Sequence, residues 1–241
     1  KVNSSTASAY RYSNTYFKQT KNISIASWTP IGFSGDNLYF SGIYDGNGYT
    51  ITGMKVSVGK ANAGLFGLLK GATIKKVNVN GNVTGGRAVG GIAGYVINST
   101  ISGCINRATI VGQNGVGGII GASWKGTVTQ CSNFGSVEAK YMNLTEGEEW
   151  YMNSVGSVAG VVGENVGTVK LSFNKGNIIL TRNNTSCNTY EVIGGVVGFL
   201  GQPSSSTPGT IEDCYNVGKI SGYGTYFGGI CGDAYVGSIS R

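Results

Sequence analysis

The pentapeptide Ala63-Gly64-Leu65-Phe66-Gly67 is the first copy of a glycine-bounded unit that returns five times along the chain. The later copies are Gly-Gly-Ile-Ala-Gly ending at Gly94, Gly-Gly-Ile-Ile-Gly at Gly121, Gly-Ser-Val-Ala-Gly at Gly160, Gly-Gly-Val-Val-Gly at Gly198 and Gly-Gly-Ile-Cys-Gly at Gly232. The steps between these last glycines are 27, 27, 39, 38 and 34 residues. A short, nearly fixed period with occasional insertions predicts a stacked-repeat fold.

A second pattern follows each of the first five pentapeptides and begins with a threonine and a β-branched residue. The threonines are Thr73, Thr100, Thr127, Thr168 and Thr210. Four positions later stand Val77, Cys104, Cys131, Ser172 and Cys214, and six positions later stand Val79, Asn106, Asn133, Asn174 and Asn216. Offsets of four, six, eight and ten differ by two, so these side chains share one strand face, and the apolar tenth position makes it the inner face. We expect the stacked asparagines to bond to one another and to nearby backbone.

Each unit therefore has three short strand-like pieces, namely the pentapeptide, the threonine-led start and the alternating run. None has the period of a helix. Three strands separated by corners make one coil, and stacked coils pair as parallel strands about 4.8 Å apart. We predict an all-β fold, a right-handed parallel β-helix (solenoid) of about six or more rungs with an irregular N-terminal cap.

This solenoid is expected to be a single domain. Residues 1–62 are predicted to form the cap and the irregular opening rungs, in which aromatic residues close the open end of the stack. Residues 63–241 are predicted to be the repeat rungs. Because the sequence begins in mid-pattern and ends just after a strand has started, we expect the native polypeptide to carry further domains and to be truncated here at its C-terminus.

Composition excludes several classes of protein. The chain has 42 glycines but only 3 prolines, and 40% of its residues are hydrophobic, which excludes collagen and low-complexity disorder. Only 12% of residues are charged, a balance common on secreted surfaces. The net charge of +7 is scattered and forms no stripe with interleaved aromatic residues, so we expect no nucleic-acid partner. No apolar run is long enough to insert into a membrane.

The chain has no histidine, which removes Ser-His-Asp and Cys-His catalysis and most zinc sites. We expect no metal and no cofactor. Cys104 and Cys131 lie on adjacent rungs and could be bridged, but stacked side chains point the same way, so we favour free buried thiols. The stretch Asp45-Gly46-Asn47-Gly48 is interpreted as a turn, because it lacks the spacing of a calcium loop.

Two insertions are the most promising places for recognition. They span about residues 138–154 and 181–191, leave the same corner on consecutive rungs, and should lie side by side. The predicted binding residues are Tyr141, Glu146, Glu148, Glu149, Trp150 and Tyr151 in the first insertion and Arg182 and Tyr190 in the second. Aromatic, acidic and amide groups together can bind a sugar or a peptide, although these rings could instead pin the loop to the coil. A third insertion, residues 202–209, is interpreted as a solvated loop at another corner.

The motif Gly64-Leu65-Phe66-Gly67 and its relatives resemble the GLUG repeat. The combination of this motif with the stretches at 28–32 and 40–51 is similar to the N-terminal region of many bacterial surface proteins that carry the repeat. The resemblance covers residues 16–241. It implies a secreted or wall-attached, adhesin-like protein. Similar repeats occur as a non-catalytic part of some IgA-specific metallopeptidases, and the resemblance supplies no catalytic residues.

Together with the repeat pattern, the resemblance implies a non-catalytic, adhesin-like module of an extracellular or cell-surface bacterial protein. It would bind a host or polysaccharide glycan, or an extracellular protein, through the inserted loops. One alternative is a passive structural spacer of a larger surface protein. Another is a polysaccharide-active β-helix enzyme, although no repeat-derived pair of carboxylates has the spacing that glycoside hydrolysis needs.

Overall fold

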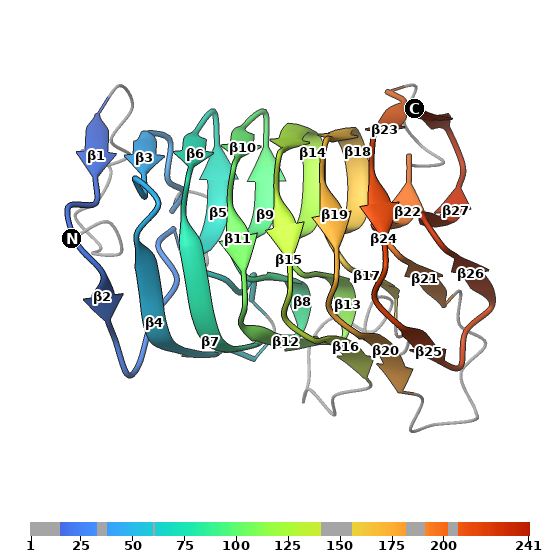
Figure 1. Cartoon of the computed structure of the whole chain (residues 1–241), viewed down its shortest axis with the longest axis horizontal. Coiled ribbons are helices and arrows are strands. Elements are labelled where there is room, and N and C mark those ends of the chain that lie inside the picture. Colours follow the sequence, from blue (N-terminus) through green and yellow to red (C-terminus); the bar gives the residue numbers. More distant parts are fainter. Residues whose placement is uncertain (1–14, 33–37, 60, 141–155, 182–190, 202–206) are drawn as a thin grey trace.

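The computed structural model describes residues 15–32, 38–59, 61–140, 156–181, 191–201 and 207–241. Its described residues are strands, turns and connections without a helix, and hence without a helix that could cross a membrane. The strands pair in parallel, and each coil lies against the next along the long axis from the N-terminal to the C-terminal end (Figure 1). The predicted all-β solenoid is confirmed.

Sheet A has twelve strands and runs the whole length of the solenoid. Its strands are β1 (Tyr16–Lys18), β3 (Ile43–Asp45), β5 (Phe66–Lys70), β6 (Thr73–Lys75), β9 (Ala93–Ile97), β10 (Thr100–Ser102), β14 (Ile120–Thr129), β18 (Val162–Lys170), β22 (Val197–Leu200), β23 (Gly209–Glu212), β27 (Cys231–Ala234) and β28 (Gly237–Ser240). The threonine column lies here in register, from Thr73 through Thr127 to Thr210.

Sheet B has eleven strands and carries the alternating run. Its strands are β2 (Ile23–Ser24), β4 (Thr50–Ser57), β7 (Asn78–Thr84), β11 (Ile105–Asn106), β12 (Thr109–Gly112), β15 (Ser132–Asn133), β16 (Val137–Lys140), β19 (Phe173–Asn174), β20 (Ile178–Thr181), β24 (Tyr215–Asn216) and β25 (Ile220–Gly222). The first and last strands, β2 and β25, show that the described opening segment and the final coil both join the same sheet.

Sheet C has five strands and completes the coil. They are β8 (Arg87–Gly90), β13 (Asn114–Gly117), β17 (Ser157–Ala159), β21 (Val192–Gly194) and β26 (Tyr226–Gly228). These strands come from residues just before the pentapeptides, where the repeat pattern had not predicted a strand.

The role predicted for the pentapeptide is corrected by these boundaries. In the second copy, the sheet C strand ends at Gly90 and the sheet A strand begins at Ala93. The pentapeptide is therefore the corner between sheets C and A and does not form a separate wall. The piece that begins with threonine belongs to the same sheet A as the residues that follow the pentapeptide.

The fourth pentapeptide also has a different register from the predicted one. The structure pairs Gly117 with Ala159 and Ile120 with Val162, so the fourth copy is residues 159–163. The predicted register was wrong because a similar stretch, residues 156–160, begins three residues earlier. Farther along β14 and β18, Trp124 pairs with Val166 whereas Thr127 pairs with Thr168, so the fourth coil is one residue shorter there.

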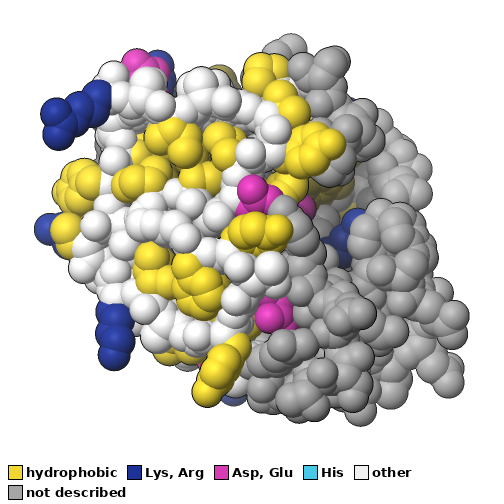
Figure 2. Space-filling model, turned by 90° about the vertical axis from the view of Figure 1, so that its right-hand side faces the viewer, with side chains coloured by type: hydrophobic (Ala, Val, Ile, Leu, Met, Phe, Trp, Pro, Cys, Tyr) yellow, Lys and Arg dark blue, Asp and Glu magenta, His cyan; other side chains and the backbone are white. Residues whose placement is uncertain are grey.

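The core is a continuous column of small and branched apolar side chains along the inside of the three sheets. Its fully buried members include Ile74, Ile101, Val128 and Val169, which occupy the same position in successive coils. At the N-terminal end, Phe40 packs against Phe66 with ring centroids 5.1 Å apart. At the other end the large apolar side chains of the final coil are exposed, as Figure 2 shows. Stacking of coils, and not the strand itself, therefore buries the inner face.

The predicted asparagine column is confirmed and forms a hydrogen-bonded ladder, which we call the asparagine ladder (Asn106, Asn133, Asn174 and Asn216). The Nδ2 group of each of the first three donates to the Oδ1 atom of the next, at 2.8, 2.7 and 2.7 Å. Each side chain also bonds to the backbone N–H and C=O two residues later, as Asn133 does with Gly135. The ladder thus satisfies the polar backbone at a bend that lies inside the protein.

A glycine stands against each asparagine of the ladder. A Cβ atom added to Gly118 would lie closer than 3.0 Å to the side chain of Asn133, and the same holds for Gly91 with Asn106 and Gly160 with Asn174. Gly195 faces Asn216 in the same way. These are the second residues of the pentapeptides in their observed register. Glycine recurs at this position from coil to coil because the amide occupies the space that a larger side chain would need.

The small, slightly polar column four residues after the threonines is also confirmed. Cys104 and Cys131 are buried and free, as predicted, while Cys214 and Cys231 are free and partly buried. The Cys131 thiol donates to the carbonyl of Thr129 at 3.3 Å, and the Ser172 hydroxyl donates to that of Lys170 at 2.8 Å. Burial raises the pKa of the Cys131 thiol well above its ordinary value. Cys187 lies outside the described residues.

We predict that Gly118→Ala destabilises the solenoid by about 3 kcal/mol or more, because the new methyl group must displace Asn133 and leave buried amide groups without partners. Gly229→Ala is the matched control. It has the same place in the last pentapeptide, yet no atom lies within 4 Å of its added Cβ. Urea denaturation of both variants measures the difference, and the control should stay within about 0.5 kcal/mol of wild type. Equal losses in the two variants would contradict the packing role.

Candidate functional site

The eight predicted binding residues lie outside the described residues, in the segments 141–155 and 182–190. The strands that lead into these segments are described, and they are neighbours. Lys140 at the end of β16 pairs with Thr181 at the end of β20, and Ser157 at the start of β17 pairs with Val192 at the start of β21. Both insertions therefore connect sheet B to sheet C on consecutive coils, which confirms the prediction that they leave the same corner.

The boundaries of the insertions differ from the predicted ones. Residues 138–140 belong to β16 and Thr181 to β20, so the sheet continues farther than the repeat pattern indicated. The third insertion lies between β22 and β23, both in sheet A, and so leaves from a different corner, as predicted. We call the place where the first two insertions leave and return the loop corner, defined by residues 138–140, 181, 157 and 191–192.

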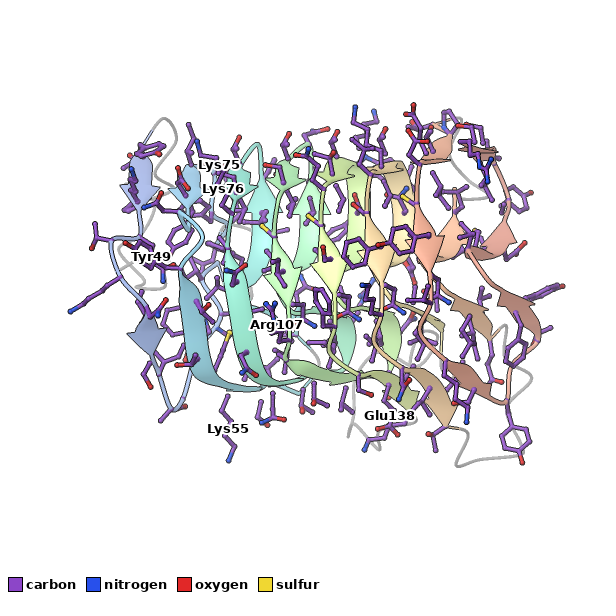
Figure 3. The ribbon with its side chains drawn as sticks, in the orientation of Figure 1. Tyr49, Lys55, Lys75, Lys76, Arg107 and Glu138 are labelled. Carbon is purple, nitrogen blue, oxygen red and sulfur yellow. The ribbon has the colours of Figure 1, made fainter. Side chains whose placement is uncertain are left out.

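Polar side chains join the two strands on the departure side of the loop corner. The Thr181 hydroxyl donates to Oε1 of Glu138 at 3.0 Å across the β16–β20 pair. The Lys140 ammonium lies 4.0 Å from Oε2 of the same carboxylate. Glu138 lies at the lower edge of the sheet in Figure 3, beside the strand ends from which the two segments leave. The neighbouring strand ends are thus tied together through side chains as well as through the sheet.

A carboxyl group stands on the return side. The Ser157 hydroxyl donates to Oε1 of Glu164 at 3.2 Å, and the Glu164 carboxyl carbon lies 3.6 Å from where a Cβ on Gly115 would be. Gly115 has a φ of +60°, so glycine here allows the left-handed backbone. Ser157 is the first residue of β17, and Glu164 therefore lies close to the end of the first insertion.

Burial is the main influence on this carboxyl group. It raises the pKa of Glu164 above the ordinary value of 4.5, while the hydrogen bond from Ser157 and the charge of Arg87 act in the opposite direction. Burial also raises the pKa of the nearby Tyr95, with a further contribution from the negative charge of Glu164. A partly desolvated carboxyl group and its hydroxyl partner can both bond to hydroxyl or amide groups of a ligand.

Neither Glu164 nor Ser157 was predicted from the sequence. A signal was present, because Glu164 occupies the position that holds Tyr95, Ala122 and Phe199 in other coils. The same column holds a second acid in the last coil, where Asp233 pairs with Phe199. The correct register of the fourth coil is needed before these two acids among apolar residues become visible in one column. In the part of the chain that the structure describes, no group of three or more His, Cys, Asp or Glu side chains is placed to hold a metal ion.

Comparison with known proteins gives a likeness of fold. No protein-family model matches the chain, and no curated protein matches it. Among solved structures, the chain is similar to a "putative immunoglobulin A1 protease" from Bacteroides ovatus, with a TM-score of 0.59 and 21% identity over 90% of this chain and 77% of that one. This likeness supports the solenoid architecture, and the resemblance to GLUG repeats continues to rest on the motif residues.

We predict that Glu164→Gln stabilises the protein at neutral pH. Because the pKa of Glu164 is raised in the folded state, the protonated carboxyl group contributes to the stability of the wild-type protein. This contribution is fully present below the ordinary pKa and is lost as pH rises through the folded-state pKa. The stability gained by the amide should therefore grow as pH rises and vanish in acid. Melting temperatures of both proteins across pH 3–8, a range of about five units, measure this difference.

Asp45→Asn is the control, because the pKa of Asp45 is shifted in the opposite direction. Tyr16 donates to the Asp45 carboxylate at 2.6 Å, and this bond lowers the pKa of Asp45 below its ordinary value of 3.8. Asp45 also accepts from the backbone N–H of Asn47 at 2.8 Å, which confirms the predicted turn. The loss of stability in Asp45→Asn should be present near neutral pH and should disappear as pH falls through the folded-state pKa of Asp45. The same pH trend in both variants would contradict the assignment at Glu164.

Proposed function

We propose that this chain is a non-catalytic, adhesin-like module of a secreted or cell-surface bacterial protein. In this proposal it binds a host or polysaccharide glycan, or an extracellular protein, through the two insertions at the loop corner. The observation that carries the proposal is the pairing of Lys140 with Thr181 and of Ser157 with Val192, because it brings together the ends of two insertions that are rich in aromatic, acidic and amide residues.

Neighbouring strands in a sheet lie about 4.8 Å apart, so the two insertions begin and end side by side on a rigid base. Loops held by a rigid scaffold are the usual carriers of recognition, and Tyr141, Trp150 and Tyr151 offer contact area together with hydrogen-bonding groups. Glu138 at the loop corner, and Glu164, which accepts a hydrogen bond from Ser157 there, extend the same chemistry onto the described strands.

A non-catalytic role is proposed on the basis of the repeat columns. Hydrolysis of a glycosidic bond needs two carboxyl groups about 5–9 Å apart with a cleft between them. On the return side one column contributes Glu164 and, two coils later, Asp233, roughly 9.6 Å apart by the strand spacing and with Phe199 between them. This arrangement suits binding of hydroxyl groups better than hydrolysis. A spacer without any ligand is the alternative that the same scaffold would also serve.

We predict that Trp150→Ala combined with Tyr151→Ala reduces ligand binding at least tenfold, because aromatic anchors supply most of the binding energy at such surfaces. The measurement is binding of the whole chain to arrays of bacterial and host glycans and of extracellular proteins. Tyr235→Ala is the control, since Tyr235 is 56% exposed in the final coil and belongs to neither insertion. Absence of any ligand for the wild-type protein would support the spacer and contradict this proposal.

A further inference from the structure

The outer face of sheet B carries three aromatic side chains on successive coils, which we call the aromatic stripe (Phe134, Phe173 and Tyr215). Phe173 and Tyr215 pair in register and stack with ring centroids 4.9 Å apart and an interplanar angle of 8°. Phe134 meets Phe173 edge to face at 5.7 Å. Phe134 and Tyr215 are 40% and 46% exposed, so the stripe lies on the surface.

Two cations are held against this stripe. The Arg107 guanidinium lies 5.0 Å from the centre of the Phe134 ring, and the Lys175 ammonium lies 5.9 Å from that ring and 5.4 Å from the Phe173 ring. Arg107, Phe134 and Lys175 each follow an asparagine of the ladder, so they occupy equivalent positions on three successive coils. Arg107 is labelled in Figure 3 on the strands of sheet B.

The base under these side chains is rigid. The backbone N–H groups of Arg107, Phe134 and Lys175 donate to the previous coil at 2.8, 2.9 and 2.8 Å. Asn106, Asn133 and Asn174 fix the same strands from the inside. The strands that carry both cations are therefore fixed before any ligand arrives, which lowers the entropic cost of binding.

From this arrangement we infer that the aromatic stripe and its two cations form a binding surface for an acidic polysaccharide, such as a polyuronate, lying along the solenoid axis. Arg107 and Lys175 stand two coils apart, roughly 9.6 Å by the strand spacing. An extended chain of pyranose sugars advances by nearly one strand spacing per sugar. Carboxylates on every second sugar would therefore meet both cations, while the sugar edges contact the apolar rings between them.

The surroundings suit a sugar polymer with charged groups. Exposed or half-exposed Thr109, Ser136 and Asn177 follow on the same face of sheet B and offer partners for hydroxyl groups. The nearest acids in the sequence are Glu212 and Asp213, which precede Tyr215 at the far end of the stripe, and Glu138, which follows Phe134. The Glu138 carboxylate is already paired with Lys140 and Thr181, so the part between Arg107 and Lys175 attracts anions. This surface is separate from the loop corner, and it adds a second binding surface to the proposed function.

A single-stranded nucleic acid fits this surface less well. Its bases bind proteins by stacking on free aromatic faces. Here Phe173 and Tyr215 cover one another, and Arg107 lies over Phe134. The rings thus hold the cations and present their edges, and they leave little room for a base.

The test is titration of the whole chain with polygalacturonate at low salt, with dextran and an oligothymidylate as comparison ligands. We expect polygalacturonate to bind, dextran to bind at least tenfold more weakly, and added salt to weaken the complex by screening. The double variant Arg107→Gln, Lys175→Gln should lose about tenfold in affinity, corresponding to about 1.4 kcal/mol. Oligothymidylate binding as tight as that of polygalacturonate would overturn the assignment to polysaccharide.

A charge-matched control removes two exposed cations on sheet A, with Lys18→Gln in β1 and Lys125→Gln in β14. This control should stay within about twofold of wild type, because the effect belongs to the stripe and not to net charge. Phe134→Leu keeps the charge but removes the ring and should weaken binding severalfold. Equal losses in the stripe and control variants, or no loss in Phe134→Leu, would contradict the inference. Tyr235→Ala removes an exposed aromatic side chain outside both surfaces and should leave polygalacturonate binding unchanged.

Discussion

The amide group of an asparagine, bonded on both sides to its neighbours, is the interaction on which the rest of this solenoid depends. Asn133 accepts from Asn106, donates to Asn174, and also bonds to the N–H and C=O of Gly135. These bonds hold the bend of sheet B at one length in each coil. They also require glycine at positions such as Gly118, because the amide fills the space that a larger side chain would need. Two features that look independent in the sequence are therefore one packing constraint.

This constraint also determines where the chain can vary. The bend at the asparagines and the pentapeptide corner keep their lengths from coil to coil. The insertions fall instead at the loop corner and between β22 and β23. Coils differ by one residue between Val166 and Thr168, and again where Ile51–Met54 of β4 face Val79–Gly81 of β7. The scaffold thus separates an interior that repeats from coil to coil from exposed places that can acquire binding residues. The outer face of sheet B uses the same regularity, because Arg107, Phe134 and Lys175 occupy equivalent positions on successive coils and project in one direction.

Much of the architecture could be predicted from the repeat columns, because stacking places equal residues over one another. The asparagine ladder, the free thiols and the shared corner of the two insertions followed from spacing alone. Sheet C could not be predicted, since its strands lie between the two patterns. The fourth pentapeptide was misplaced because a similar stretch lies three residues earlier. One corner is left-handed in every coil of the threonine-led repeat, and Gly103 and Asp213 are residue types that favour this conformation there. Lys76, Gln130 and Leu171 adopt it at the same position with φ near +50°, and their residue types do not signal it. Glu164 was missed because its column becomes visible only in the correct register.

A double-mutant cycle between Asn133 and Asn174 tests the central claim most directly. The single and double alanine variants would be compared by urea denaturation. If the ladder acts as a connected network, the two substitutions should be coupled by about 1 kcal/mol or more, because either one already breaks the bond between the two side chains. The pair Asn106 and Asn216, separated by three coils and thus by about 14 Å, should be additive within about 0.5 kcal/mol. Additive losses for Asn133 and Asn174 would contradict the account.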